Sequence, residues 1–229
     1  MCKVAVGLPT DKQYSIGAAD DVEKSLPGEP IFADVKLAPG DCIEKTLLEG
    51  KNYEVREFDQ LVGAKLASIT CEPSLRCNGL DESRQSTIAQ IVAGSTTTVT
   101  LTNQSTLGTL KLCVQNGGVP ALSMFMIEVS PFSVAANPGE PTGASPTIRE
   151  GQCQDVTLKE GIYTVAMSPA GPGFLVDALN CNPIDLCSGF FPTSVKAFVV
   201  AGSTTHVSFT VTFSTSRVSR ERPLLRPTP

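Results

Sequence analysis

Eight cysteines are the residues best equipped for chemistry, and they fall into two sets with nearly the same spacing. The first set is Cys2, Cys42, Cys71 and Cys77, and the second is Cys113, Cys153, Cys181 and Cys187. An even number in each set is typical of a disulfide framework formed in an oxidising compartment. A four-cysteine zinc site in each set is the alternative, but zinc sites usually contain pairs separated by about two to four residues. We therefore expect disulfides and no metal.

Three connectivities are possible within a set of four cysteines. The last two cysteines of each set lie close together in a predicted loop, and the first two belong to predicted strands that could be neighbours. We therefore expect the pairs Cys2–Cys42, Cys71–Cys77, Cys113–Cys153 and Cys181–Cys187.

The cysteine sets belong to two copies of one longer pattern. The segment GDCIEKTLLEGKNYEV (40–55) matches GQCQDVTLKEGIYTV (151–165), and IVAGSTTTVTLT (91–102) matches VVAGSTTHVSFT (199–210). A period of about 110 residues is too long for a solenoid repeat and suits an independent domain. The sequence therefore predicts two domains in tandem.

Comparison of the copies isolates three polar residues at positions that should face a core. Strand alternation predicts inward-facing side chains at Lys3, Glu57 and Asn103. The second copy has Val114, Met167 and Val211 at the matching positions. Because an isolated buried charge is costly, we expect the three polar residues to act as one set. The alternatives are a plain ion pair between Lys3 and Glu57 that is capped by Asn103, and an alignment of the two copies that is off by one residue.

Short strands must position these residues. Runs such as CKVAV, NYEVREF and TTVTLTN in the first copy, and LKLCV, IYTVAMS and THVSFTVTF in the second, alternate or are β-branched, without helical periodicity. Roughly seven such strands per copy predict an all-β fold of two tandem antiparallel Ig-like, prealbumin-like sandwiches with disulfides inside each domain. We expect the domains over 1–106 and 107–215 and a disordered basic tail over 216–229.

The start of the first copy differs from that of the second. Copy two opens with TLGTLKL ahead of its first cysteine, whereas the chain opens at MCKVAV. We therefore expect the first strand to be clipped, as in a piece of a longer secreted protein. Secretion also fits the cysteine pattern, so we expect an extracellular or cell-surface location, although no export signal is present in this sequence.

Composition argues against several classes of function. The chain has 229 residues, a formal net charge of -5, 6% aromatic residues and no Trp. It therefore lacks the basic surface and stacking side chains that nucleic acid binding needs, and it has no apolar run of about 18 residues for membrane insertion. His206 is the only histidine, on the outward phase of a predicted strand, so we expect a surface histidine, no enzyme and no cofactor.

The order of four strand motifs resembles a known family. The motifs are G-T-L-K-x-C, G-x-C, G-x-Y-x-V and a closing V-x-x-G-x-T-T-x-V-x-F/L-T, and they cover all but the tail. They are similar to the prealbumin-like, Cna B-type (SpaA-like) sandwich domains of secreted bacterial surface proteins. The resemblance implies a non-catalytic structural or adhesive module, a stalk or spacer, whose partners are a surface ligand or neighbouring domains of the same polypeptide.

The resemblance also implies a reaction for the three polar residues. Members of this family can carry a lysine on the first strand, an asparagine on the last and an acid between them, which join in an intramolecular isopeptide bond. By analogy, desolvation would leave the Lys3 amine free to attack the Asn103 carboxamide, while a protonated Glu57 would polarise that carbonyl and carry protons.

A carbohydrate- or protein-binding module that uses the long loops 7–30 and 131–150 is the alternative function. It predicts exposed aromatic side chains in these loops, where the sequence offers Tyr14 and Phe132. Two weaker patterns remain. Asp20, Asp21, Glu23 and Asp34 form an acidic cluster whose alternatives are a calcium site and a solvated loop face, and we expect the loop face. Asn103 begins a glycosylation sequon, a pattern with many false positives.

Overall fold

The computed structural model describes residues 1–20, 32–58, 61–78, 81, 85–168 and 171–214. Within these residues the chain forms strands throughout, and its helical turns are two short 3-10 segments, η1 (Ser74–Arg76) and η2 (Ile184–Leu186). No helix in the described ranges has the length and apolar character required to cross a membrane. The predicted tail 216–229 and the acidic cluster of Asp20, Asp21, Glu23 and Asp34 fall outside the described residues and side chains.

Residues up to Ser105 form two sheets that face each other. One sheet has the order β3 (Phe32–Leu37), β2 (Tyr14–Asp20), β4 (Asn52–Glu57) and β6 (Ser86–Gln90), and the other has the order β1 (Cys2–Val6), β7 (Thr98–Ser105) and β5 (Ala64–Glu72). Their inward side chains alternate with exposed ones, and the buried apolar ones form a single cluster that includes Ile16, Val55 and Leu101.

Residues from Leu107 onward form a second pair of sheets with the same order of matching strands and one further edge strand on each sheet, β14 (Cys187–Phe191) and β11 (Cys153–Lys159). One contains β10 (Thr147–Arg149), β9 (Met124–Ser133), β12 (Gly161–Ser168), β15 (Ser194–Val199) and β14. The other contains β11, β8 (Leu107–Asn116), β16 (Thr204–Phe213) and β13 (Phe174–Asn182). Their buried side chains form a separate cluster, which includes Leu110, Val165 and Phe209.

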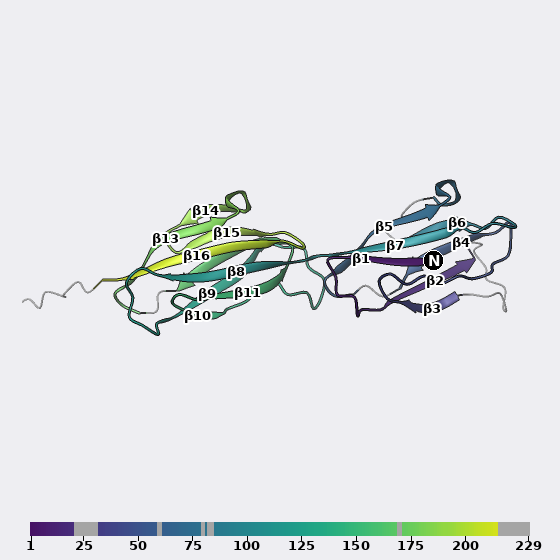
Figure 1. Cartoon of the computed structure of the whole chain (residues 1–229). Helices are drawn as coiled ribbons and strands as arrows, with labels where there is room; N and C mark the ends of the chain where they lie inside the picture. The colour runs from purple at the N-terminus through teal and green to yellow at the C-terminus, as the bar shows by residue number, and fades with distance from the viewer. Residues whose placement is uncertain (21–31, 59–60, 79–80, 82–84, 169–170, 215–229) are drawn as a thin grey trace, which may run out of the picture.

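The two sandwiches lie end to end, and Thr106 alone separates β7 of the first from β8 of the second (Figure 1). The all-β sandwich fold with internal disulfides is thus confirmed. One strand pair in each sandwich is parallel, although we expected antiparallel sandwiches: β1 pairs with β7, and β8 pairs with β16. The first and last strands of each sandwich therefore run side by side in the same direction.

All eight cysteines are joined, in the four pairs that the sequence predicts: Cys2–Cys42, Cys71–Cys77, Cys113–Cys153 and Cys181–Cys187. The first and third bonds tie the opening strand of a sandwich to the segment beside it. The second and fourth close the short 3-10 turns. Because every sulfur is used in a disulfide, no thiolate is left for the alternative zinc sites.

Candidate functional site

Lys3, Glu57 and Asn103 meet in the interior of the first sandwich. Lys3 Nζ donates to Glu57 Oε2 at 2.7 Å and to Asn103 Oδ1 at 2.5 Å, and Asn103 Nδ2 donates to Glu57 Oε1 at 2.7 Å. The exposed fractions of the three residues are 1%, 6% and 1%. An amine, a carboxylate and a carboxamide thus form a closed triangle of charge-assisted hydrogen bonds shielded from water.

Strand register explains this meeting. Lys3 lies on β1 and Asn103 on β7, two hydrogen-bonded neighbours in which Lys3 pairs with Leu101. Inward residues of parallel neighbours lie on one face, so both side chains point at the opposite sheet. Glu57 ends β4 of that sheet, where it pairs with Ile16 of β2. The acid therefore reaches across the core to both partners.

The matching positions in the second sandwich are occupied by apolar side chains. The strand register supports this match. Glu57 pairs with Ile16 in the first sandwich, and Met167 pairs with Ile127 in the second. Likewise, Asn103 pairs with Leu66, and Val211 pairs with Val176. Val114, Met167 and Val211 are all buried, with exposed fractions of 1%, 3% and 1%. The three polar residues of the first sandwich therefore occupy positions that an apolar core fills in the second.

Burial sets the electrostatics of the triangle. Desolvation lowers the pKa of Lys3, although the hydrogen bond and the charge of Glu57 act in the opposite direction. The centre of the Tyr14 ring lies 4.1 Å from Lys3 Nζ, so that the ring covers the amine. Burial, and then the charge of Glu57, raise the pKa of Tyr14. The site therefore favours a neutral amine more than water does, which is the form that can act as a nucleophile.

The buried position of Tyr14 corrects the expectation that it is an exposed aromatic of a binding loop. It begins strand β2 and its exposed fraction is 0%. Phe132, the other expected aromatic, is exposed, and Lys196 Nζ lies 3.6 Å from the centre of its ring. The sequon at Asn103 also fails as a surface site, because its side chain is buried and hydrogen-bonded.

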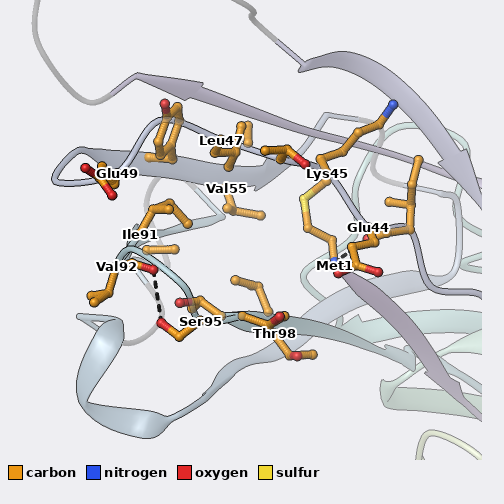
Figure 2. A pocket seen from close by; sticks show the side chains of 18 of the residues that line it. Met1, Glu44, Lys45, Leu47, Glu49, Val55, Ile91, Val92, Ser95 and Thr98 are labelled. Carbon is orange, nitrogen blue, oxygen red and sulfur yellow. Dashed lines mark hydrogen bonds between the residues drawn. The ribbon is translucent and has the colours of Figure 1, made fainter.

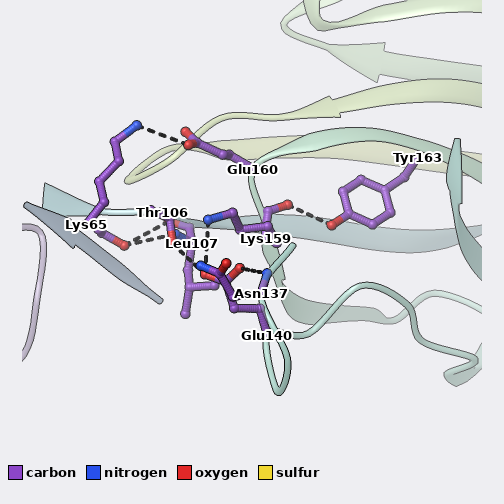
Figure 3. A network of polar contacts seen from close by, with 9 residues as sticks. Lys65, Thr106, Leu107, Asn137, Glu140, Lys159, Glu160 and Tyr163 are labelled. Atoms are coloured by element: carbon purple, nitrogen blue, oxygen red, sulfur yellow. Dashed lines mark hydrogen bonds and ion pairs between the residues drawn. The ribbon is translucent and has the colours of Figure 1, made fainter. Parts of the chain in front are cut away.

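A second buried polar network, which the sequence analysis missed, lies where the two sandwiches join (Figure 3). Lys159 Nζ donates to Glu140 Oε1 at 3.0 Å, Thr106 Oγ1 donates to the same oxygen at 3.1 Å, and the backbone N–H of Asn137 donates to Glu140 Oε2 at 2.7 Å. Burial acts to raise the pKa of Glu140, but these donors outweigh it, so that its pKa is lowered. The carboxylate is held ionised at the connection between β7 and β8.

A signal for this network was present in the repeat. In the aligned segments TLLEG and TLKEG, Lys159 stands where the first copy has Leu48. The same kind of difference separates Lys3 from Val114, but there the polar residue is in the first copy, whereas Lys159 is in the second. Glu140 gives no such signal, because it lies in a loop outside any alternating strand.

His206 does not lie on the open surface as expected. It is half-buried, and its Nε2 lies 2.9 Å from Sγ of Cys113. Although Cys113, Cys153 and His206 cluster tightly, the two sulfurs are bonded to each other. The cluster is therefore a histidine packed on a disulfide rather than a set of metal ligands.

Comparison with solved structures returns bacterial surface proteins at low similarity. The major pilin of Streptococcus pyogenes is 13% identical, with 91% of this chain and 95% of the pilin covered and a TM-score of 0.35. A Mobiluncus mulieris adhesin containing intramolecular disulfide, isopeptide and ester cross-links is 13% identical, with 90% and 87% covered and a TM-score of 0.40. No family model and no curated protein matches the sequence. Values this low do not establish a family for this chain.

Proposed function

We propose that this chain is a non-catalytic extracellular module, a stalk or spacer of a surface or adhesive protein, built from two tandem sandwich domains over 1–106 and 107–215. The observation that carries the proposal is the buried triangle of Lys3, Glu57 and Asn103. Four disulfides support an oxidising location, since such bonds persist outside the cytosol.

The triangle is arranged for one covalent reaction. The neutral Lys3 amine attacks Cγ of Asn103, whose Oδ1 already accepts a hydrogen bond from that amine. Glu57 contacts both nitrogens, so it can take a proton from Nζ and deliver one to Nδ2. A new Nζ–Cγ amide bond forms, the Cγ–Nδ2 bond breaks, and ammonia leaves. The reaction happens once per molecule and serves structure rather than turnover.

The position of this bond suits a load-bearing part. It joins β1 to β7, the first and last strands of the first sandwich, and β7 continues through Thr106 into β8. Tension that enters at the beginning of the chain would pass from Lys3 to Asn103 and on to the second sandwich. Lys3 and Asn103 are 100 positions apart, and the part of the chain between them would carry none of this tension.

Single-molecule stretching tests this function directly. With the disulfides reduced and the chain held at both ends, the segment between Lys3 and Asn103, 100 positions long, should add nothing to the extension. Asn103→Ala should release it and lengthen the extension by roughly 330–360 Å, the length of that many fully extended residues. Full release of the unsubstituted first sandwich would contradict the proposal. Val211→Ala, at the matching position of the second sandwich, is the control and should leave the extension unchanged.

A further inference from the structure

The Cys113–Cys153 disulfide lies on the outer face of the second sandwich, beside the only histidine of the chain. Cys113 pairs with Cys153 across β8 and β11. Its neighbours Leu112 and Val114 face the core, so Cys113 points outward. His206 lies on β16, the strand on the other side of β8, and its Nε2 is 2.9 Å from Cys113 Sγ. One sulfur of this bond is therefore in direct contact with an imidazole nitrogen.

The two sulfurs of the bond differ in their access to solvent. Cys113 is 4% exposed, whereas Cys153 is an exposed residue on β11, the edge strand of its sheet. A thiolate has to approach a disulfide through a sulfur that it can reach. Attack therefore falls on Cys153, and Cys113 becomes the leaving group. The imidazole of His206 thus contacts the sulfur that would leave.

We propose that Cys113–Cys153 is a thiol-exchange site, at which an external thiolate becomes covalently attached to Cys153. The incoming sulfur forms a bond to Cys153 Sγ, the Cys113–Cys153 bond breaks, and its electron pair leaves on Cys113 Sγ. The N–H at Nε2 of His206 donates to this sulfur, and a leaving thiolate that is stabilised in this way departs faster. One thiolate is consumed and one is produced, so the exchange needs no other oxidant or reductant. The inference goes beyond the proposed stalk role and does not depend on the cross-link.

The charged groups near His206 leave its N–H as the main donor to the sulfur. Lys111 of β8 lies opposite His206, and Asp155 of β11 lies opposite Lys111. On its other side, β13 places the uncharged Asn182 opposite His206. The formal charges of Lys111 and Asp155 cancel, so the imidazole is the group that distinguishes this disulfide.

Opening of the bond leaves the fold in place. Strand β11 stays paired with β8 through the backbone from Gln154 to Lys159. The Leu158 side chain of the same strand is fully buried in the core of the second sandwich. Because these contacts do not involve the sulfurs, Cys153 can carry an attached thiol while the sandwich remains folded.

The first sandwich contains the equivalent bond without an imidazole. Thr98 stands at the position of His206 in the repeat, and it lines a groove together with Cys2 and Cys42 (Figure 2). Cys42 is exposed, as Cys153 is. Both bonds therefore offer an accessible second cysteine, and Cys2–Cys42 serves as an internal reference that any change at His206 should leave unaffected.

Exchange with reduced glutathione tests the site in the full chain. Alkylation at early times followed by peptide mapping should place glutathione on Cys153. His206→Thr, which installs the residue of the first copy, should slow the opening of Cys113–Cys153 by about tenfold, because the leaving sulfur loses its donor. Opening of Cys2–Cys42 in the same sample should not change.

A histidine that only shields the bond predicts the opposite result, because its removal would expose the disulfide. Equal or faster opening in His206→Thr would therefore overturn the proposal, as would glutathione attached to Cys113. A thioredoxin that keeps only its attacking cysteine distinguishes a protein thiol from a small one. A mixed disulfide between this thioredoxin and Cys153 would assign the site to protein thiols, and an adduct with glutathione alone would assign it to small thiols. No adduct with either would contradict an exchange site.

Discussion

Lys3 Nζ and Asn103 Oδ1 lie 2.5 Å apart although 100 positions separate the two residues in the sequence. The contact joins two parallel neighbours, β1 and β7, at the place where the second sandwich carries Val114 and Val211. Glu57 accepts a hydrogen bond from each of the two side chains, so a carboxyl group lies beside both of them in the core.

Replacement of the acid should stop the cross-link. Glu57→Gln keeps the size and a carbonyl oxygen, but it cannot take a proton from Lys3, so both Lys3 and Asn103 should remain intact. Intact mass of the reduced variant should equal the sequence mass. Glu54→Gln, a half-buried residue on the same strand, is the control and should behave like the unsubstituted chain. A cross-linked Glu57→Gln protein would show that the acid is dispensable.

Replacement of Lys3, Glu57 and Asn103 together by apolar residues should destabilise the first sandwich less than replacement of Lys3 alone. The triple variant Lys3→Val, Glu57→Met and Asn103→Val installs side chains of the kind found in the second sandwich. Lys3→Val alone leaves Glu57 buried without a cation and should cost about 3–5 kcal/mol of unfolding free energy relative to the triple variant. Urea unfolding of both proteins measures this difference. If the single variant is as stable as the triple variant, the three residues do not form a coupled set.

The junction between the sandwiches offers a matched pair of salt bridges. Lys159 and Glu140 are buried, whereas the nearby Lys65 and Glu160 are 48% and 36% exposed at their side chains. Lys159→Met should destabilise the second sandwich by about 3–5 kcal/mol because it leaves a buried carboxylate unpaired. Lys65→Met should change stability by less than about 1 kcal/mol. Equal effects in urea unfolding would show that burial of the first pair does not matter.

Acid should weaken the same junction. The pKa of Glu140 is lowered by folding from an ordinary value of 4.5. Its contribution is therefore fully present above pH 4.5 and is lost as the pH falls through the lower folded value. The stability difference between the unsubstituted chain and Glu140→Gln, measured by urea unfolding, should be large at neutral pH and shrink below pH 4.5. A difference that is constant across this range would contradict a charged Glu140.

The two disulfides of the second sandwich should stabilise it by different amounts because they close loops of different length. Cys113–Cys153 spans 40 positions and Cys181–Cys187 spans 6. In the chain-entropy model, the double alanine variants should lose about 4 and about 2 kcal/mol, respectively. Thermal and urea unfolding of the two variants measure the losses. The reverse order would mean that native-state contacts outweigh loop closure.

The repeat made part of this structure predictable. Alternation in a strand fixes which side chains share a face, and the second copy served as an apolar reference for Lys3, Glu57 and Asn103. Alternation is the same in parallel and antiparallel pairs, so the parallel direction of β1 and β7 could not be predicted from it. Glu140 was missed because loop residues follow no period, and Tyr14 was misplaced because a long loop was assumed to extend past the start of β2.

Intact mass of the fully reduced protein tests the central claim most directly. If Lys3 and Asn103 are joined, the mass should lie about 17 Da below the sequence mass, the loss of one ammonia molecule in amide formation. Asn103→Ala should show no deficit. A full sequence mass for the reduced, unsubstituted chain would contradict the cross-link and leave the triangle as a buried ion pair.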